Sequence, residues 1–204
     1  MKRKFIYLLY ILIVVGTLQS CIKYERLTHL SESDLEWVTN RHIGEVMYFQ
    51  SQNGNRDTIK VWNITIQNST DPINWNYLQT GGTEYIANAC VELVINHYTG
   101  VKGNFYIKKK SNDEPIYFST GFFMRWTQND MPLSTINMKI RNIIMDDIMF
   151  FDDSLLGPVN EYSPSNPIVS FAWSKQYGLV QYTFQDGTVF TRIDMENQQH
   201  NFRK

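Results

Sequence analysis

The feature of this sequence that most constrains its fold is the alternation of apolar and polar residues in short segments separated by turn residues. The stretch Tyr177–Asp194, YGLVQYTFQDGTVFTRID, carries an Asp186-Gly187 pair between two such segments. Side chains of a strand alternate between faces, and Asp-Gly is typical of a two-residue type I′ hairpin turn. We therefore interpret Asp186 as a turn residue and not as a catalytic group. The expected register sets Phe184 opposite Val189, Tyr182 opposite Thr191 and Val180 opposite Ile193 on the apolar face, and places Phe190 and Arg192 on the other face.

Similar patterns continue through most of the chain. A first hairpin is expected where IGEVMYFQS and DTIKVWNITIQ flank the turn-rich QNGNRD, with Trp62, Ile64 and Ile66 on one face. About nine strands with short polar turns favour an all-β fold. We expect an antiparallel meander that forms a curved sheet, half-barrel or barrel, with a two-sheet β-sandwich as the alternative. The residues expected to face inward from the later strands include Ala87, Ala89, Val91, Leu93, Ile95, Phe105, Ile107, Ile116, Phe118, Phe122, Met124 and Trp126.

The first forty residues have a different character. Met1–Ser20 begins with three basic residues, continues as the apolar run Phe5–Val15 and ends in small residues, which is the layout of a secretory signal. The apolar run is shorter than the ~20 residues that a membrane-spanning helix needs, although an uncleaved anchor is the alternative. Ser31 followed three residues later by Asp34 predicts a capped helix at Glu32–Thr39.

The segment Leu18-Gln19-Ser20-Cys21 resembles a bacterial lipobox, with Cys21 as the lipid acceptor. The resemblance implies cleavage before Cys21 and acylation of both its sulfur and its new amino terminus. More than one acyl chain makes membrane anchoring stable. We therefore expect a signal peptide at 1–20, a lipidated cysteine and tether at 21–30, and a single β-rich domain at 31–204.

Three stretches together resemble a broad group of uncharacterised lipoproteins of the Bacteroidetes. They are the lipobox, IGEVMYFQSQNGNRDTIKV after the short helix, and FAWSKQYGLVQYTFQDGTVFTR near the end. The resemblance implies an all-β fold and an envelope location, without an assigned activity. The acidic run that often follows the cysteine in surface-displayed members is absent from CIKYER, which favours attachment to the outer membrane facing the periplasm.

Charge and composition argue against nucleic acid as a partner. Residues 1–20 carry three basic residues and no acid, so their removal changes the formal net charge from −1 to −4. The basic run Lys108-Lys109-Lys110 is interpreted as a solvated strand end. Cys90 is then the remaining cysteine, and a lone thiol in an apolar strand is more often a packed residue than a nucleophile.

The sequence offers no clear catalytic or metal-binding motif. Asp146, Asp147, Asp152 and Asp153 cluster in MDDIMFFDD, but in an extended strand Asp146 and Asp152 are ~20 Å apart, too far to share a calcium ion. We expect each aspartate pair to cap one end of a strand, and a calcium site only if the segment bends. His29, His42, His97 and His200 lack the spacing of a zinc site.

The segment Gln67–Tyr85 is too long and polar for a tight turn, and loops of this length are often functional. Within it, Trp75 and Tyr77, flanked by Asn74 and Asn76, form either a lid on the core or a binding platform for a sugar or a protein. We therefore expect a lipid-anchored envelope protein without catalytic role or cofactor, which binds or assembles with an envelope protein or a glycan. The alternatives are a carrier of an apolar or lipid-like ligand in a barrel or half-barrel cavity, and a carbohydrate-binding module that uses the Trp75/Tyr77 loop.

Overall fold

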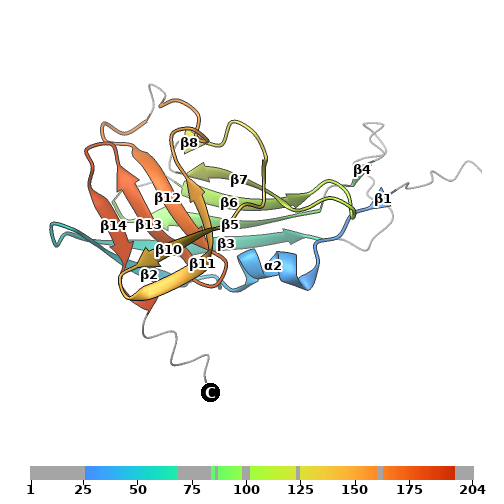
Figure 1. Ribbon diagram of the computed structural model, residues 1–204, viewed down its shortest axis with the longest axis horizontal. Helices are drawn as coiled ribbons and strands as arrows, with labels where there is room; N and C mark the ends of the chain where they lie inside the picture. The colour runs from blue at the N-terminus through green and yellow to red at the C-terminus, as the bar shows by residue number, and fades with distance from the viewer. Residues whose placement is uncertain are drawn as a thin grey trace, which may run out of the picture.

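The structure is a computed structural model, and it describes residues 26–68, 84–85, 87–97, 102–122, 125–159 and 163–195. These residues form a short helix and fourteen strands, of which four contain only two residues (Figure 1). The sequence predicted about nine strands. In chain order the elements are β1 (Arg26–Leu27), α2 (Glu32–Thr39), β2 (Val46–Ser51), β3 (Arg56–Gln67), β4 (Glu84–Tyr85), β5 (Ala87–Ile95), β6 (Lys102–Lys109), β7 (Tyr117–Phe122), β8 (Arg125–Trp126), β9 (Met131–Pro132), β10 (Ile136–Ile140), β11 (Ile143–Phe151), β12 (Ile168–Ser174), β13 (Gly178–Phe184) and β14 (Val189–Arg192).

Twelve of these strands belong to one open, curved antiparallel sheet, as the alternation predicted. The order is β10-β11-β12-β13-β14-β2-β3-β5-β6-β7-β8, with β9 also paired to β7, and β1 and β4 form a separate parallel pair. The two ends of the described domain meet where β14 pairs with β2. Between the sheet edges β8 and β10, a bridge between Thr127 and Leu156 ties the β8 side to the segment after β11. The sheet therefore curls back on itself without forming two separate layers.

The main core lies inside this curl and is largely aromatic. Figure 1 shows the orange strands β12 and β13 crossing in front of β3, β5 and β6. Their inward rings meet: Phe105 of β6 stacks on Trp173 of β12 with centroids 4.2 Å apart, and Phe122 of β7 stacks on Phe171 at 4.1 Å. Each such pair contributes about 0.5–1.5 kcal/mol beyond the burial of its area. The strands that are distant in the sheet order are thus held together by ring stacking.

The predicted helix is confirmed with its predicted ends. Ser31 is the N-cap, its hydroxyl accepts the backbone N–H of Asp34, and the Asp34 carboxylate accepts the N–H of Ser31. The helix buries Trp37 and Val38, and Trp37 packs edge-on against Phe118 at 4.9 Å. α2 therefore covers part of the core beside β5 and β6.

The C-terminal hairpin is present, but its predicted register was wrong by one residue. Tyr182 pairs with Phe190, not with Thr191, and the two rings stack with centroids 5.2 Å apart. Gly187 has a positive φ of 83° and Asp186 does not, so the connection is not a type I′ turn. A type I turn followed by a left-handed glycine is the common three-residue hairpin loop. Phe190, which was expected on the polar face, is consequently buried.

Asp186 is a turn residue, as the sequence indicated. Its carboxylate accepts the backbone N–H of Thr188 at 2.8 Å and the side-chain amide of Asn166 at 2.9 Å. The hydrogen bond from the Thr188 backbone is the main reason that the pKa of Asp186 lies below its usual value. The carboxylate is therefore occupied in closing the loop.

Val180 was expected on the same face as Tyr182 and Phe184, and this was wrong. The pairing shifts between Trp173–Leu179 and Ala172–Gln181, so Val180 is an extra residue in β13. A bulge of this kind redirects a side chain locally. Val180 therefore packs in a second, smaller cluster that also contains Ile140, Met145, Ile148, Ala172, Tyr177 and Met195.

Candidate functional site

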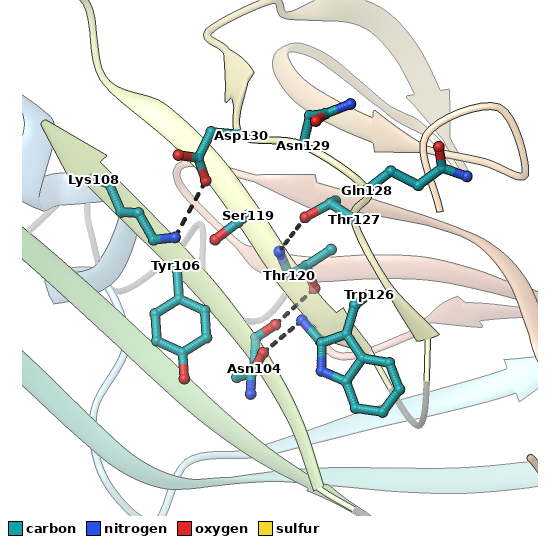
Figure 2. Close-up of a pocket in the computed structure, with 11 residues that line it drawn as sticks. Asn104, Tyr106, Lys108, Ser119, Thr120, Trp126, Thr127, Gln128, Asn129 and Asp130 are labelled. Atoms are coloured by element: carbon teal, nitrogen blue, oxygen red, sulfur yellow. Dashed lines mark hydrogen bonds and ion pairs between the residues drawn. The ribbon is translucent and has the colours of Figure 1, made fainter. Parts of the chain in front are cut away.

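A pocket of about 560 Å³ opens on the outer face of the sheet, over β6 and β7 (Figure 2). On β6, Phe105 and Ile107 are fully buried and face inward. The residues that alternate with them therefore point to the outer face. The floor is formed mainly by Asn104, Tyr106, Lys108, Ser119 and Gly121, and the wall is the segment Trp126–Asp130. We call this site the Trp126 pocket.

The pocket exists because the strand that edges β7 is interrupted. β8 pairs with β7 through Gly121 and Trp126, whereas β9 pairs with it through Phe118 and Met131. The Thr127 N–H still reaches the Thr120 carbonyl at 2.9 Å. The three residues 128–130 consequently stand opposite a single residue of β7 and bow away from the sheet, as extra residues in a ladder do.

Gly121 makes room for the indole of Trp126. A Cβ at position 121 would lie 2.7 Å from Trp126 Nε1 and 2.7 Å from Asn104 Oδ1, closer than real contacts allow. Asn104 Oδ1 also accepts the Gly121 N–H, so the amide is fixed beside the ring (Figure 2). Trp126 was expected to face inward, and this was wrong. Trp126 is 53% exposed because it lies opposite Gly121 of the neighbouring strand, on the outer face.

Arg125 anchors this short strand from the inner side. Its side chain is buried, and its Nε and Nη2 donate to the Gly157 carbonyl at 3.0 and 2.7 Å. Its Nη1 also pairs with the carboxylate of Asp153. The Gly157 N–H in turn donates to the Trp126 carbonyl at 2.7 Å. The backbone that carries the indole is therefore held from both sides.

The charged side chains at the upper end of the pocket pair with one another, two lysines with one aspartate. Asp130 pairs with Lys108 at 3.2 Å and with Lys110 at 3.3 Å. Burial alone would raise the pKa of Asp130, but its bonds to Lys108 and Lys110 outweigh burial and hold the pKa below the usual value. Lys109 points elsewhere and pairs with Asp34 at 3.2 Å. The basic run lies at the end of β6 and Lys110 is exposed, as expected for a solvated strand end, and each lysine in addition has an acidic partner.

Tyr106 lines the pocket, and its neutral hydroxyl is hydrogen-bonded to the Cys90 thiol. Burial, followed by the neighbouring Cys90, raises the pKa of Tyr106 to about 12. Cys90 is buried beneath it, and burial raises the pKa of its thiol to about 12. At neutral pH both groups stay protonated, so Cys90 is a packed residue, as its sequence context indicated, and lacks the thiolate that a nucleophile needs.

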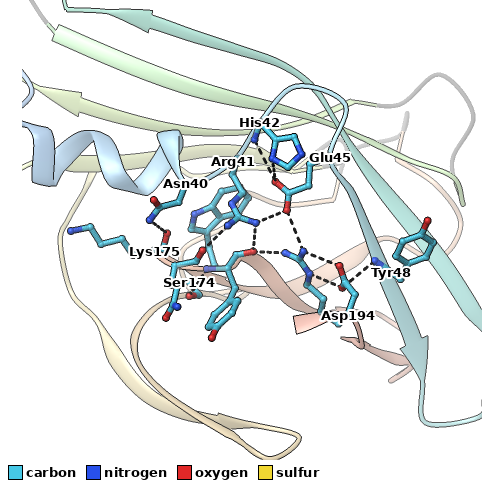
Figure 3. A network of polar contacts seen from close by, with 12 residues as sticks. Asn40, Arg41, His42, Glu45, Tyr48, Ser174, Lys175 and Asp194 are labelled. Carbon is cyan, nitrogen blue, oxygen red and sulfur yellow. Dashed lines mark hydrogen bonds and ion pairs between the residues drawn. The ribbon is translucent and has the colours of Figure 1, made fainter. Parts of the chain in front are cut away.

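A buried network of charges joins three chain segments elsewhere in the domain (Figure 3). The Glu45 carboxylate pairs with Arg41 at 2.5 Å and with Arg192 at 3.2 Å, and the three side chains are only 0–5% exposed. Arg192 also binds Asp194 at 2.8 Å, and both arginines donate to the Tyr177 carbonyl. Arg192 was expected on the polar, solvent-facing side, and this was wrong, because its partner Glu45 is distant in sequence.

The charge network holds the segment after α2 against neighbouring strands. Burial lowers the pKa of Arg41 to about 10, and the charge of Glu45 opposes that effect, so the guanidinium remains protonated at neutral pH. Gly178 has a φ of 72°, and a Cβ there would lie 2.7 Å from Arg41 Cδ. Since Arg41 follows α2 and Glu45 precedes β2, these contacts fix the helix against the starts of β2 and β13.

The residues that the sequence singled out for binding and anchoring lie outside the described residues. They are Asn74, Trp75, Asn76 and Tyr77 of the Gln67–Tyr85 segment, and the lipid acceptor Cys21. The roles assigned to these residues remain predictions.

Asp147, Asp152 and Asp153 of MDDIMFFDD have separate partners. Asp146 and Asp147 were expected to cap one end of a strand, and this was wrong, because they lie inside β11. Asp147 accepts hydrogen bonds from the Ser174 hydroxyl and from the Gln176 N–H. Asp152 closes the turn after β11 by accepting the N–H of Ser154. Within the described ranges, three or more histidine, cysteine, aspartate or glutamate side chains do not come together in a group that could hold a metal ion.

One signal in the sequence pointed towards the Trp126 pocket. Gly121 interrupts the apolar strand YFSTGFF, and glycine inside a strand often marks a bulge or a close approach.

In comparisons with known proteins, no family model, no curated protein and no solved structure matches the chain. Among the described residues, no helix is long and apolar enough to cross a membrane.

Proposed function

We propose that this chain is a lipid-anchored protein of the bacterial cell envelope that binds carbohydrate in the Trp126 pocket and has no catalytic role. The anchoring part of the proposal rests on the LQSC segment and its resemblance to a lipobox. The binding part rests on the pocket, and the sugar-binding loop predicted around Trp75 is not needed for it.

The observation that carries the proposal is a half-exposed indole held rigidly beside uncharged polar groups. Trp126 is fixed through Gly121 and Arg125, and Asn104, Ser119 and Tyr106 lie on the same floor. A pyranose ring has an apolar face of C–H groups and an edge of hydroxyls. The indole supplies a flat apolar surface for the face, while amide and hydroxyl groups both donate and accept hydrogen bonds at the edge.

The size and rigidity of the pocket also support binding of a small polar ligand. Ligand pockets typically measure about 300–1,000 Å³, and the Trp126 pocket falls within that range. A ring that is already held in place loses little conformational entropy when a ligand arrives. A saccharide unit therefore fits both the volume and the chemistry.

The protonation states of the lining support a binding role over a catalytic one. General acids and bases work best with pKa values near the operating pH. In this pocket the pKa of Tyr106 is raised to about 12, and the pKa of Asp130 is lowered by Lys108 and Lys110. Both groups are therefore better suited to hydrogen bonding than to proton transfer.

The carrier alternative receives less support from the inner face of the sheet. An apolar ligand would need space between the strands that face each other across the curl. In the described core, the stacked rings of Phe105, Trp173, Phe122 and Phe171 occupy that position. Their close stacking favours a filled interior.

The test is carbohydrate binding by the full chain, purified in a detergent without a sugar headgroup. A glycan array identifies a ligand, and calorimetry then compares wild type with Trp126→Ala and with Tyr48→Ala, a matched exposed aromatic on β2. We expect Trp126→Ala to weaken binding at least about tenfold and Tyr48→Ala to leave it unchanged. The proposal fails if no glycan binds, or if both variants bind like the wild type.

A further inference from the structure

We infer that the carbohydrate site extends from the Trp126 pocket across the outer face of the sheet to Trp62, so that its ligand is a linear, neutral oligosaccharide. This inference rests on the proposed carbohydrate binding at Trp126 and adds the length and direction of the ligand.

The pairing of five strands places both tryptophans on one cross-strand row. Asn63 of β3 is opposite Glu92 of β5, Glu92 is opposite Asn104 of β6, and Asn104 is opposite Gly121 of β7. Gly121 is in turn opposite Trp126. Neighbouring strands lie ~4.8 Å apart, so the four steps from β3 to β8 span ~19 Å along the sheet. This length accommodates several linked pyranose rings.

Trp62 is placed on this row by a bulge in β3. The pairing shifts between Val61 and Asn63, which makes Trp62 the extra residue, and bulges commonly re-aim a side chain. Trp62 is 54% exposed, nearly the same fraction as Trp126. The Lys102 ammonium lies 5.4 Å from the centre of the ring, which restrains it by a cation–π contact. Trp62 is therefore a second exposed and oriented indole.

Hydrogen-bonding groups occupy the space between the two indoles. Asn63 Nδ2 donates to Glu92 Oε1 at 3.4 Å, and Asn104 Oδ1 accepts the Gly121 N–H. Gly121 has no side chain, so the Trp126 indole and the Asn104 amide lie close together over its backbone. Two flat apolar surfaces separated by amide and carboxylate groups match a chain whose rings have apolar faces and hydroxyl edges.

The charges along the row favour a neutral ligand. Lys102 lies 3.9 Å from Glu92, and Lys108 and Lys110 share Asp130. Each charged side chain that we place on the row thus has a partner of opposite sign, with three lysines paired to two carboxylates. A strongly anionic polymer would have to displace these pairs, whereas a neutral saccharide would not.

The experiment is a chain-length series on the full chain in a detergent without a sugar headgroup. The probes are the mono- to hexasaccharides of β-1,4-linked glucose, β-1,4-linked mannose, β-1,4-linked N-acetylglucosamine and α-1,4-linked glucose, measured by calorimetry. In at least one series we expect affinity to rise about tenfold or more between the monosaccharide and the tetrasaccharide, and then to level off. Trp62→Ala should remove this gain and leave monosaccharide affinity unchanged, whereas Trp126→Ala should weaken both.

The variants separate the inference from the proposal on which it rests. If Trp126→Ala weakens binding but affinity is independent of chain length, the ligand does not reach Trp62 and the inference fails while the proposed function stands. The inference also fails if affinity grows with length but Trp62→Ala has no effect. If no saccharide binds, both fail. Circular dichroism melting of each variant, with Tyr48→Ala as the control, checks that the fold is intact.

Discussion

Replacement of Glu45 by glutamine tests whether the buried charge network stabilises the fold. Glutamine keeps the shape of the side chain and one acceptor oxygen but removes the negative charge that lies between Arg41 and Arg192. Glu45 Oε1 lies 2.5 Å from Arg41 Nη1 and 3.2 Å from Arg192 Nη2, and the side chains of Arg41 and Arg192 are 2% and 0% exposed. Removal of one partner from a buried ion pair typically costs about 3–5 kcal/mol, because a charge is left uncompensated. In a domain of this size about 1 kcal/mol corresponds to roughly 2–4 °C, so the melting temperature should fall by about 6–20 °C.

Urea unfolding at neutral pH, followed by circular dichroism, measures this loss as a change in midpoint at constant slope. Glu36→Gln is the matched control, because Glu36 pairs with Lys175 at 2.6 Å but its side chain is 53% exposed. An exposed pair contributes at most about 1 kcal/mol, so the control should change little. A Glu45→Gln variant that loses no more than the control would refute the view that this network stabilises the domain.

Three further changes test other parts of the account. Gly121→Ala should weaken saccharide binding about tenfold or more by displacing the Trp126 indole, with a smaller effect on stability, as calorimetry and melting on the same variant would show. The pKa of Asp130 is lowered, so its ion pair with Lys108 persists above the ordinary carboxyl value of 3.8 and is lost as pH falls through the lowered value. Saccharide affinity should therefore stay constant from neutral pH to 3.8 and decline below it, and a decline already above that value in wild type but not in Asp130→Asn would contradict this assignment. Cys21→Ala should move the protein from the membrane fraction to the soluble fraction, and persistent membrane attachment would refute lipidation at that residue.

Local signals in the sequence were sufficient where a few neighbouring residues determine the structure. The helix at Glu32–Thr39 was predicted with its ends because Ser31 and Asp34 satisfy each other's backbone groups within one turn. The first hairpin, the inward faces of β5 and β6 and the turn at Asp186 were also predicted, since each depends on alternation or on turn chemistry. The expectation that Trp62 shares a face with Ile64 and Ile66 was wrong, because the bulge in β3 turns Trp62 to the outer face.

The errors arose where the pairing is irregular or where the partner is distant in sequence. A single added residue in the turn before β14 moved Phe190 into the core, and an extra residue in β13 moved Val180 to the other cluster. Arg192 is buried because it meets Glu45, which lies 147 positions away. Trp126 faces outward because it lies on a separate strand, β8, which runs antiparallel to β7 and pairs Trp126 with Gly121. Beyond Trp126, three residues stand opposite one residue of β7, an irregularity that alternation alone cannot predict. The candidate pocket depends on that irregularity and was therefore not predicted.

The measurement that tests the central claim most directly is a titration of the full chain with the best-binding oligosaccharide, followed by nuclear magnetic resonance of the five tryptophan indole N–H signals. Each signal is assigned by substitution of one tryptophan at a time. The account predicts that the signals of Trp126 and Trp62 shift with saturation, while those of the buried Trp37 and Trp173 stay in place. A shift confined to Trp75, with Trp126 unchanged, would contradict the account and return the binding site to the loop that the sequence first indicated.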